Sequence, residues 1–161
     1  MSRYQQLGAA LAAARRHNAL EHAQVAQLAG DLVRAVCLDF GIADPTGHIH
    51  AGNLEGLDDP YLIHSPLPKS PSYRMKLTLM IHDDPPVVGI TPKITPFGLT
   101  FLPRGGAEFD VKILDDAPPI RVTLDDLTSY KLFASAIYDS LMRRLTIDRA
   151  APPSGPVPDV N

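Results

Sequence analysis

Apolar residues occupy every second position from Tyr73 to Ile81, and this pattern constrains the fold more than any other feature of the chain. A period of two is typical of a strand with one buried and one exposed face. The pattern recurs over 97–101, 107–114 and 120–124, with short turns rich in Pro, Gly and Asp between the repeats. Because short connections favour antiparallel neighbours, we predict that segment 73–124 forms an antiparallel meander of four to five strands.

Residues from about 125 to 147 place apolar side chains at helical spacing, which predicts a long C-terminal helix. Thr123 and Asp126 are spaced as a capping box at its start. Because a sheet with one apolar face needs a second layer to cover it, we expect this helix to pack on the sheet. The predicted fold class is α+β.

The first forty residues carry another helical pattern. Ser2 and Gln5 are spaced as a capping box, and apolar residues recur at helical spacing after them. Asn18 is a suitable N-cap for a new helix, and Gly41 is a suitable stop, because glycine accepts the left-handed conformation that follows many helices. We therefore predict two helices with a joint near Asn18, forming an αα-hairpin over 2–40.

Between the hairpin and the sheet lies segment 43–72, which is acidic and contains five prolines and three glycines. This composition predicts an irregular segment, with brief strands at most, near 48–51 and 61–63. A second Pro-rich stretch, 150–161, cannot build a core and is predicted to be a flexible tail. The predicted organisation is one domain over 1–149 followed by this tail.

Composition excludes several classes of protein. The net charge is −3, from 15 basic and 18 acidic residues, so the chain is neither a strongly basic nucleic-acid binder nor a polyacidic mimic. Basic residues in the sheet region fall on its polar face, but the aromatic residues there fall on its apolar face. An RNA-binding sheet needs both on one face, so no nucleic-acid interface is predicted.

The chain also lacks the sequence signals of membrane insertion and export. No stretch reaches the roughly 18 apolar residues of a membrane span, and the apolar run 7–14 precedes its arginine pair, the reverse of a signal peptide. Cys37 is the single cysteine, which excludes an intramolecular disulfide and a cysteine-rich zinc site. We expect a cytoplasmic protein without a membrane partner, and ten arginines against five lysines indicate a bacterium or a phage.

His48 and His50 are the candidate metal ligands. Residues two apart on a strand point the same way, and imidazole with carboxylate holds zinc, iron or manganese. Local spacing fixes no third ligand for them. The chain has no phosphate-binding loop motif, no nucleophile elbow and no Ser, His and acid set that spacing supports, so we assign no catalytic residue and expect no cofactor.

The leading hypothesis is a non-enzymatic accessory or protein-interaction protein that acts in an assembly or regulatory complex. Its interface is predicted on the helical hairpin, at Leu7, Leu11, Leu28 and Leu32, and binds another protein or a second copy of the chain. Two alternatives stay open. One is a metal-binding protein or metal-dependent enzyme that uses the two histidines, and the other is a binder of an apolar small molecule between the sheet and the C-terminal helix.

Overall fold

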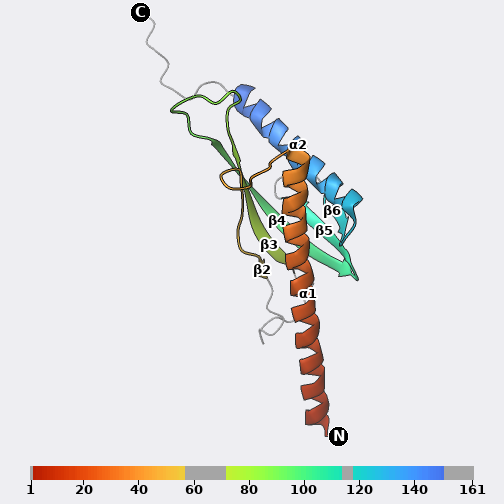
Figure 1. The fold of residues 1–161 in the computed structure, drawn as a ribbon. Coiled ribbons are helices and arrows are strands. Elements are labelled where there is room, and N and C mark those ends of the chain that lie inside the picture. Colours follow the sequence, from red (N-terminus) through yellow and green to blue (C-terminus); the bar gives the residue numbers. More distant parts are fainter. Residues whose placement is uncertain (1, 57–71, 114–117, 151–161) are drawn as a thin grey trace, which may run out of the picture.

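The computed structural model describes residues 2–56, 72–113 and 118–150, and within them the chain forms two helices and one antiparallel sheet (Figure 1). The predicted tail after Ala150 and the possible strand at 61–63 lie outside the described residues. The elements follow one another along the chain as α1 (Arg3–Phe40), β1 (Ile49–Ala51), β2 (Glu55–Gly56), β3 (Tyr73–Ile81), β4 (Lys93–Gly105), β5 (Glu108–Ile113), β6 (Ile120–Thr123) and α2 (Leu127–Ala150).

The sheet has the strand order β1-β3-β4-β5-β6, and β2 also pairs with β3. Strands β3 to β6 form the predicted meander, in which each strand pairs with the next along the chain. The short strands β1 and β2 come from the segment that was predicted to be irregular, and both pair with β3. The α+β fold class is therefore confirmed.

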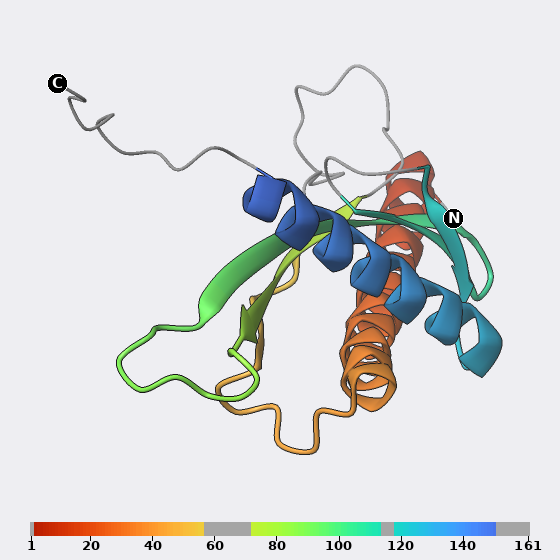
Figure 2. The ribbon, with the colours of Figure 1, turned by 90° about the horizontal axis from the view of Figure 1, so that it is seen from above.

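One face of the sheet is apolar and buried, as the alternation predicts. Across β3, β4 and β5, Tyr73 pairs with Phe101 and Phe101 pairs with Val111, so neighbouring strands present their apolar residues on the same face. Both helices cover this inner face, and Figure 2 shows α1 and α2 together on one side of the strands. The largest fully buried side chains from the sheet and helices are Phe97, Phe101, Phe109, Phe133, Leu28, Leu32, Leu77, Leu99 and Ile137.

The predicted hairpin over 2–40 is wrong, because α1 is one continuous helix of 38 residues. Ser2 and Gln5 form the predicted capping box, and Gly41 ends the helix with a left-handed φ of 69°. The helix does not break at Asn18. Without a glycine or proline nearby, a break there gives up several backbone hydrogen bonds, and a single N-cap replaces few of them.

Only the second half of α1 belongs to the body of the protein. Its buried residues start at Val25, and residues 2–17 are exposed without exception. At 1.5 Å per residue the whole helix is about 57 Å long. Figure 1 shows its N-terminal half extending past the sheet and past α2. We call residues 3–20 the arm and the rest of the described structure the body.

The C-terminal helix packs on the sheet as predicted, but it begins and is capped differently. It starts at Leu127, and the Asp126 carboxylate accepts a hydrogen bond of 3.0 Å from the backbone N–H of Thr128. The backbone N–H of Thr123 donates instead to the Ser129 hydroxyl at 3.2 Å, so Thr123 and Asp126 do not form a capping box. Asp125, the residue before Asp126, has a left-handed φ of 64° that turns the chain from β6 into α2.

Candidate functional site

His48 lies next to His82 in the structure. Their ring centroids are 5.2 Å apart. His48 Nδ1 is 3.1 Å from the backbone oxygen of Asp44, and His82 Nε2 is 3.1 Å from that of Gly47. His50 lies on β1, opposite Thr78 of β3, and its side chain is exposed. Two of the four imidazole nitrogens of the His48–His82 pair therefore face backbone carbonyls.

Among the described residues, the fold places no third ligand beside His48 and His50. Within the part of the chain that the structure describes, no group of three or more His, Cys, Asp or Glu side chains is placed to hold a metal ion. Stable zinc sites in proteins have at least three protein ligands, and the described residues bring only His48 and His82 together here, so the metal site stays a prediction.

The four leucines of the predicted interface separate into two pairs. Leu28 and Leu32 are fully buried in the core of the chain itself, against the sheet and α2, so they are not available to a partner in this fold. Leu7 and Leu11 lie on the arm and are 69% and 42% exposed. Of the four leucines predicted at the interface, only Leu7 and Leu11 are therefore accessible to a partner.

The exposed apolar residues of the arm lie in line with the buried residues of the same helix. Steps of three and four residues lead along one stripe from the arm into the core. In order, the stripe contains Tyr4, Leu7, Leu11, Ala14, Asn18, Glu21, Val25, Leu28 and Leu32. The body covers it from Glu21 onward, where Glu21 Oε1 accepts a 3.1 Å hydrogen bond from the Tyr73 hydroxyl. The body therefore lies on the same side of α1 as the apolar stripe of the arm.

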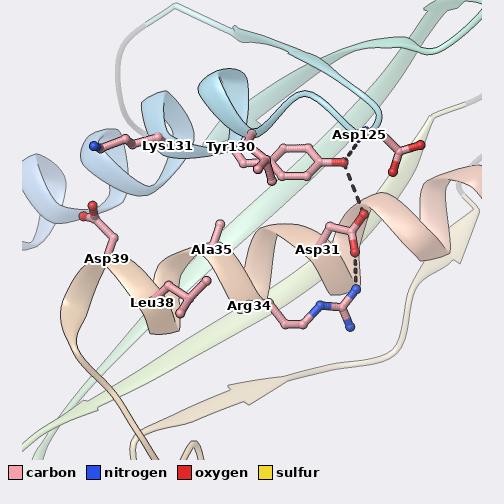
Figure 3. A pocket seen from close by; sticks show the side chains of 9 residues that line it. Asp31, Arg34, Ala35, Leu38, Asp39, Asp125, Tyr130 and Lys131 are labelled. Carbon is pink, nitrogen blue, oxygen red and sulfur yellow. Dashed lines mark hydrogen bonds and ion pairs between the residues drawn. The ribbon is translucent and has the colours of Figure 1, made fainter.

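A second candidate site is an open pocket of about 720 Å³ between α1 and the start of α2 (Figure 3). At its base the Tyr130 hydroxyl donates to the Asp31 carboxylate at 3.2 Å and accepts from the backbone N–H of Asp125 at 2.7 Å. Partial burial raises the pKa of Tyr130; the Asp125 N–H opposes this shift and the Asp31 carboxylate adds to it. Arg34 pairs with the other Asp31 oxygen. These contacts hold the two helices together and occupy both Asp31 oxygens.

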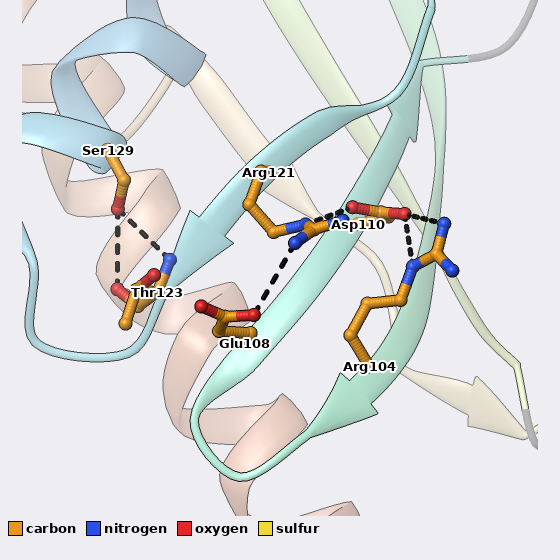
Figure 4. Close-up of polar contacts among 6 residues, drawn as sticks. All are labelled: Arg104, Glu108, Asp110, Arg121, Thr123 and Ser129. Carbon is orange, nitrogen blue, oxygen red and sulfur yellow. Dashed lines mark hydrogen bonds and ion pairs between the residues drawn. The ribbon is translucent and has the colours of Figure 1, made fainter.

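The polar face of the sheet carries an ion-pair cluster around one buried carboxylate (Figure 4). Asp110 is only 4% exposed, and its two carboxylate oxygens accept hydrogen bonds from Arg104 Nε at 2.5 Å and Arg121 Nε at 2.6 Å. Burial alone raises the pKa of Asp110, but the hydrogen bonds and charges of Arg121 and Arg104 outweigh it and hold that pKa below its usual range. Glu108 adds an exposed contact of 3.4 Å to Arg121. The cluster neutralises itself and is best explained as structural.

Two further features bear on chemistry. Burial raises the pKa of the Cys37 thiol, which keeps it protonated and a poor nucleophile. The space between the sheet and α2, where an apolar ligand was considered, contains the fully buried rings of Phe97, Phe109 and Phe133. Phenylalanine side chains thus fill the middle of this layer with the protein's own core.

Comparison of the chain with protein-family models, with curated proteins and with solved structures finds no match. Neither described helix combines the length and the apolar character that crossing a bilayer requires. Leu7 and Leu11 remain a predicted interface, and the pocket at Tyr130 and the cluster at Asp110 were not predicted from the sequence.

Proposed function

We propose that this chain is a non-enzymatic interaction protein that acts in an assembly, and that the arm is its binding element. The observation that carries the proposal is the stripe of Tyr4, Leu7 and Leu11, which is exposed and in line with the buried stripe of the same helix. A cytoplasmic setting, in a bacterium or a phage, belongs to the same proposal and is supported by the single free thiol and the arginine-rich composition.

Helix propensity alone does not account for the arm. Alanine is the best helix former, and the arm already contains alanine at most of its central positions, including Ala9, Ala10, Ala12 and Ala13. A helix that needed only to stay helical gains nothing from large apolar side chains on one line. Burying a leucine stabilises a complex by roughly 1.5–3 kcal/mol, so Leu7 and Leu11 form a useful binding surface for a partner.

The polar side chains of the body support a structural role more than a catalytic one. Asp110 is held by two arginines, Asp31 by Tyr130 and Arg34, and Glu21 by Tyr73. Among the residues whose side chains the structure describes, no buried side-chain nitrogen or oxygen is left without a hydrogen-bond partner. Catalytic sites typically keep such groups free for substrate, so this saturation favours the interaction protein.

The experiment is native mass spectrometry of the chain and its complexes, gently purified from the host. We expect a mass above the 17.4 kDa of one chain for the wild type, and loss of the excess in the double variant Leu7→Asp, Leu11→Asp. The matched control is Ala9→Asp, Ala13→Asp, which adds the same two charges at the same spacing on the opposite face of the arm. If both variants keep the complex, or both lose it, the arm stripe is not the binding element.

A further inference from the structure

We infer that the arm binds the arm of a second copy of this chain, and that the two helices pack antiparallel over residues 4–21 in a two-fold symmetric dimer. This inference rests on the proposed function and names the partner of the same stripe. It follows from the side of α1 on which the body lies, from the length of the exposed helix and from the distribution of charge along it.

The position of the body excludes a parallel pair of arms. The body packs on the stripe side of α1 from Glu21 to Val36, and the arm presents its leucines on that same side. In a parallel pair the two stripes face each other along both helices, so both bodies would occupy the space between the C-terminal halves. In an antiparallel pair each body lies beyond the residue-3 end of the other arm, and the two bodies do not meet.

The exposed length of the helix sets the register. The other arm extends along the stripe until its Tyr4 lies opposite Glu21, where the body begins, which gives an overlap of 18 residues (4–21), or about 27 Å. Antiparallel helices pair residues whose numbers have a constant sum, and an overlap that ends there gives a sum near 25. Leu11 then faces Ala14 of the second copy, and a large residue opposite a small one allows the helices to approach closely. Leu7 faces Asn18 of the second copy.

The charges of the arm are compatible with this register. Residues 2–20 contain Arg3, Arg15 and Arg16 and no acidic residue, so two arms repel each other wherever their arginines meet. The antiparallel register keeps them apart, because Arg15 lies level with Ala10 of the second copy and Arg16 with Ala9. It also brings Arg3 of each arm next to Glu21 of the second copy, where opposite charges attract. Antiparallel packing also places the dipoles of the two neighbouring helices in opposite directions, which is favourable.

The first experiment measures the mass of the purified full chain as its concentration is raised. We expect twice the 17.4 kDa chain mass for the wild type and for the Ala9→Asp, Ala13→Asp control, and a single chain mass for Leu7→Asp, Leu11→Asp. A purified chain that stays at one chain mass at every concentration overturns the inference. If the complex from the host still depends on the stripe in that case, the proposed function survives with a different partner. If it does not, both fail.

The second experiment determines the orientation by disulfide formation in a Cys37→Ser background. A mixture of Leu7→Cys and Asn18→Cys chains should cross-link under oxidation, and Leu7→Cys chains alone should not. In the antiparallel pair two copies of residue 7 are about 17 Å apart along the helix axis, beyond the roughly 7 Å that a disulfide spans. Efficient cross-linking of Leu7→Cys chains alone indicates a parallel pair and overturns the inference.

A spin-label measurement covers the case in which these cysteines weaken the dimer. Leu20 is 61% exposed and lies off the stripe, so a label at Leu20→Cys removes no stripe residue. The antiparallel register separates the two labels by about 22 Å along the axis, and a parallel pair places them level with each other. An inter-label distance too short for the antiparallel separation overturns the inference.

Discussion

Replacing Asp110 by asparagine tests the energetic argument about the polar face of the sheet. Asp110 is almost fully buried, yet the two arginines that hold it, Arg104 and Arg121, are 55% and 53% exposed. Asp110→Asn removes the buried charge and keeps the size of the side chain. The two arginines then lose their shared partner but remain in contact with water.

The expected loss follows from the exposure of these groups. A hydrogen bond to a charged group contributes about 1.5–3 kcal/mol, and breaking a fully buried ion pair costs about 3–5 kcal/mol. Here the arginines are half exposed and water replaces part of the interaction, so the smaller range applies. We expect Asp110→Asn to lower the free energy of unfolding by about 2 kcal/mol. For a chain of this length that corresponds to a fall in Tm of about 4–8 °C.

The assay is urea unfolding of the wild type, Asp110→Asn and the control Glu108→Gln. Glu108 lies on the same strand and contacts the same Arg121, but it is 54% exposed, so its loss should change stability by less than about 0.5 kcal/mol. Equal effects of the two substitutions would refute the reasoning, because the argument depends on the burial of Asp110. A fully stable Asp110→Asn variant would refute it as well.

The pH dependence provides a second readout of the same ion pairs. The folded protein lowers the pKa of Asp110 from the ordinary value of 3.8, so the folded state prefers the ionised carboxylate. The contribution of Asp110 to stability is therefore complete well above pH 3.8 and is lost as the pH falls through its folded pKa. The difference in unfolding free energy between the wild type and Asp110→Asn should stay constant near neutral pH and disappear in acid.

Three more predictions follow from single residues. The pKa of the Tyr73 hydroxyl should be about 12, because burial raises it first and the charge and hydrogen bond of Glu21 raise it further. Ultraviolet difference spectra of the wild type against Tyr73→Phe measure this pKa. The stability that the bond contributes is lost as the pH rises through the folded pKa. Gly41→Ala should cost about 1 kcal/mol in urea unfolding, from its φ of 69° alone, because no atom lies within 4 Å of an added Cβ. Leu28→Asp should unfold the whole body by circular dichroism, because this side chain is completely buried.

The sheet could be predicted from the sequence because its pattern depends only on which face is buried. The alternating residues of β3, β4, β5 and β6 lie on the predicted face. What the pattern did not reveal is that β4 continues through Pro96. A proline lacks the N–H that a central strand needs, but at Pro96 strand β4 pairs only with β3, since its described pairing with β5 begins at Leu99. The Pro96 carbonyl oxygen accepts a hydrogen bond of 2.9 Å from Arg144, so the polar backbone atoms of Pro96, and with them the missing donor, face the side of β4 opposite to β3.

The helix boundary at Asn18 could not be predicted from local residues. Asparagine is a good N-cap and only a moderately poor helix former, so the local sequence allows both outcomes. Continuation of the helix is decided by the hydrogen bonds on either side of Asn18 and by the packing of its second half, which begins at Val25. The continuous apolar stripe along α1 was not predicted for the same reason, because two short helices do not present one continuous stripe.

The cluster at Asp110 was missed for a different reason. The alternation on β5 places Asp110 on the polar face of the sheet, which predicts a solvent-exposed side chain. No spacing in the sequence links Arg104 to Arg121. The strand register brings them together: Asp110 pairs with Arg121 across β5 and β6, and the bulge between Pro103 and Gly105 places Arg104 beside it. The only indication of the cluster in the sequence is the mixture of acidic and basic residues on the predicted polar face of the sheet.

The continuity of α1 also explains how an exposed helical arm can bind without a large folding cost. Starting a helix is the unfavourable step, because the first turn fixes several residues for one hydrogen bond. In this chain the body fixes the C-terminal half of α1 by burying Val25, Leu28 and Leu32, so the arm only extends a helix that already exists. Leu7 and Leu11 are thereby held on one line before a partner arrives, and less conformational entropy is lost on binding. Stability of the body and affinity of the arm are coupled for this reason, and a substitution that loosens the packed half of α1 should weaken association even though it lies outside the arm.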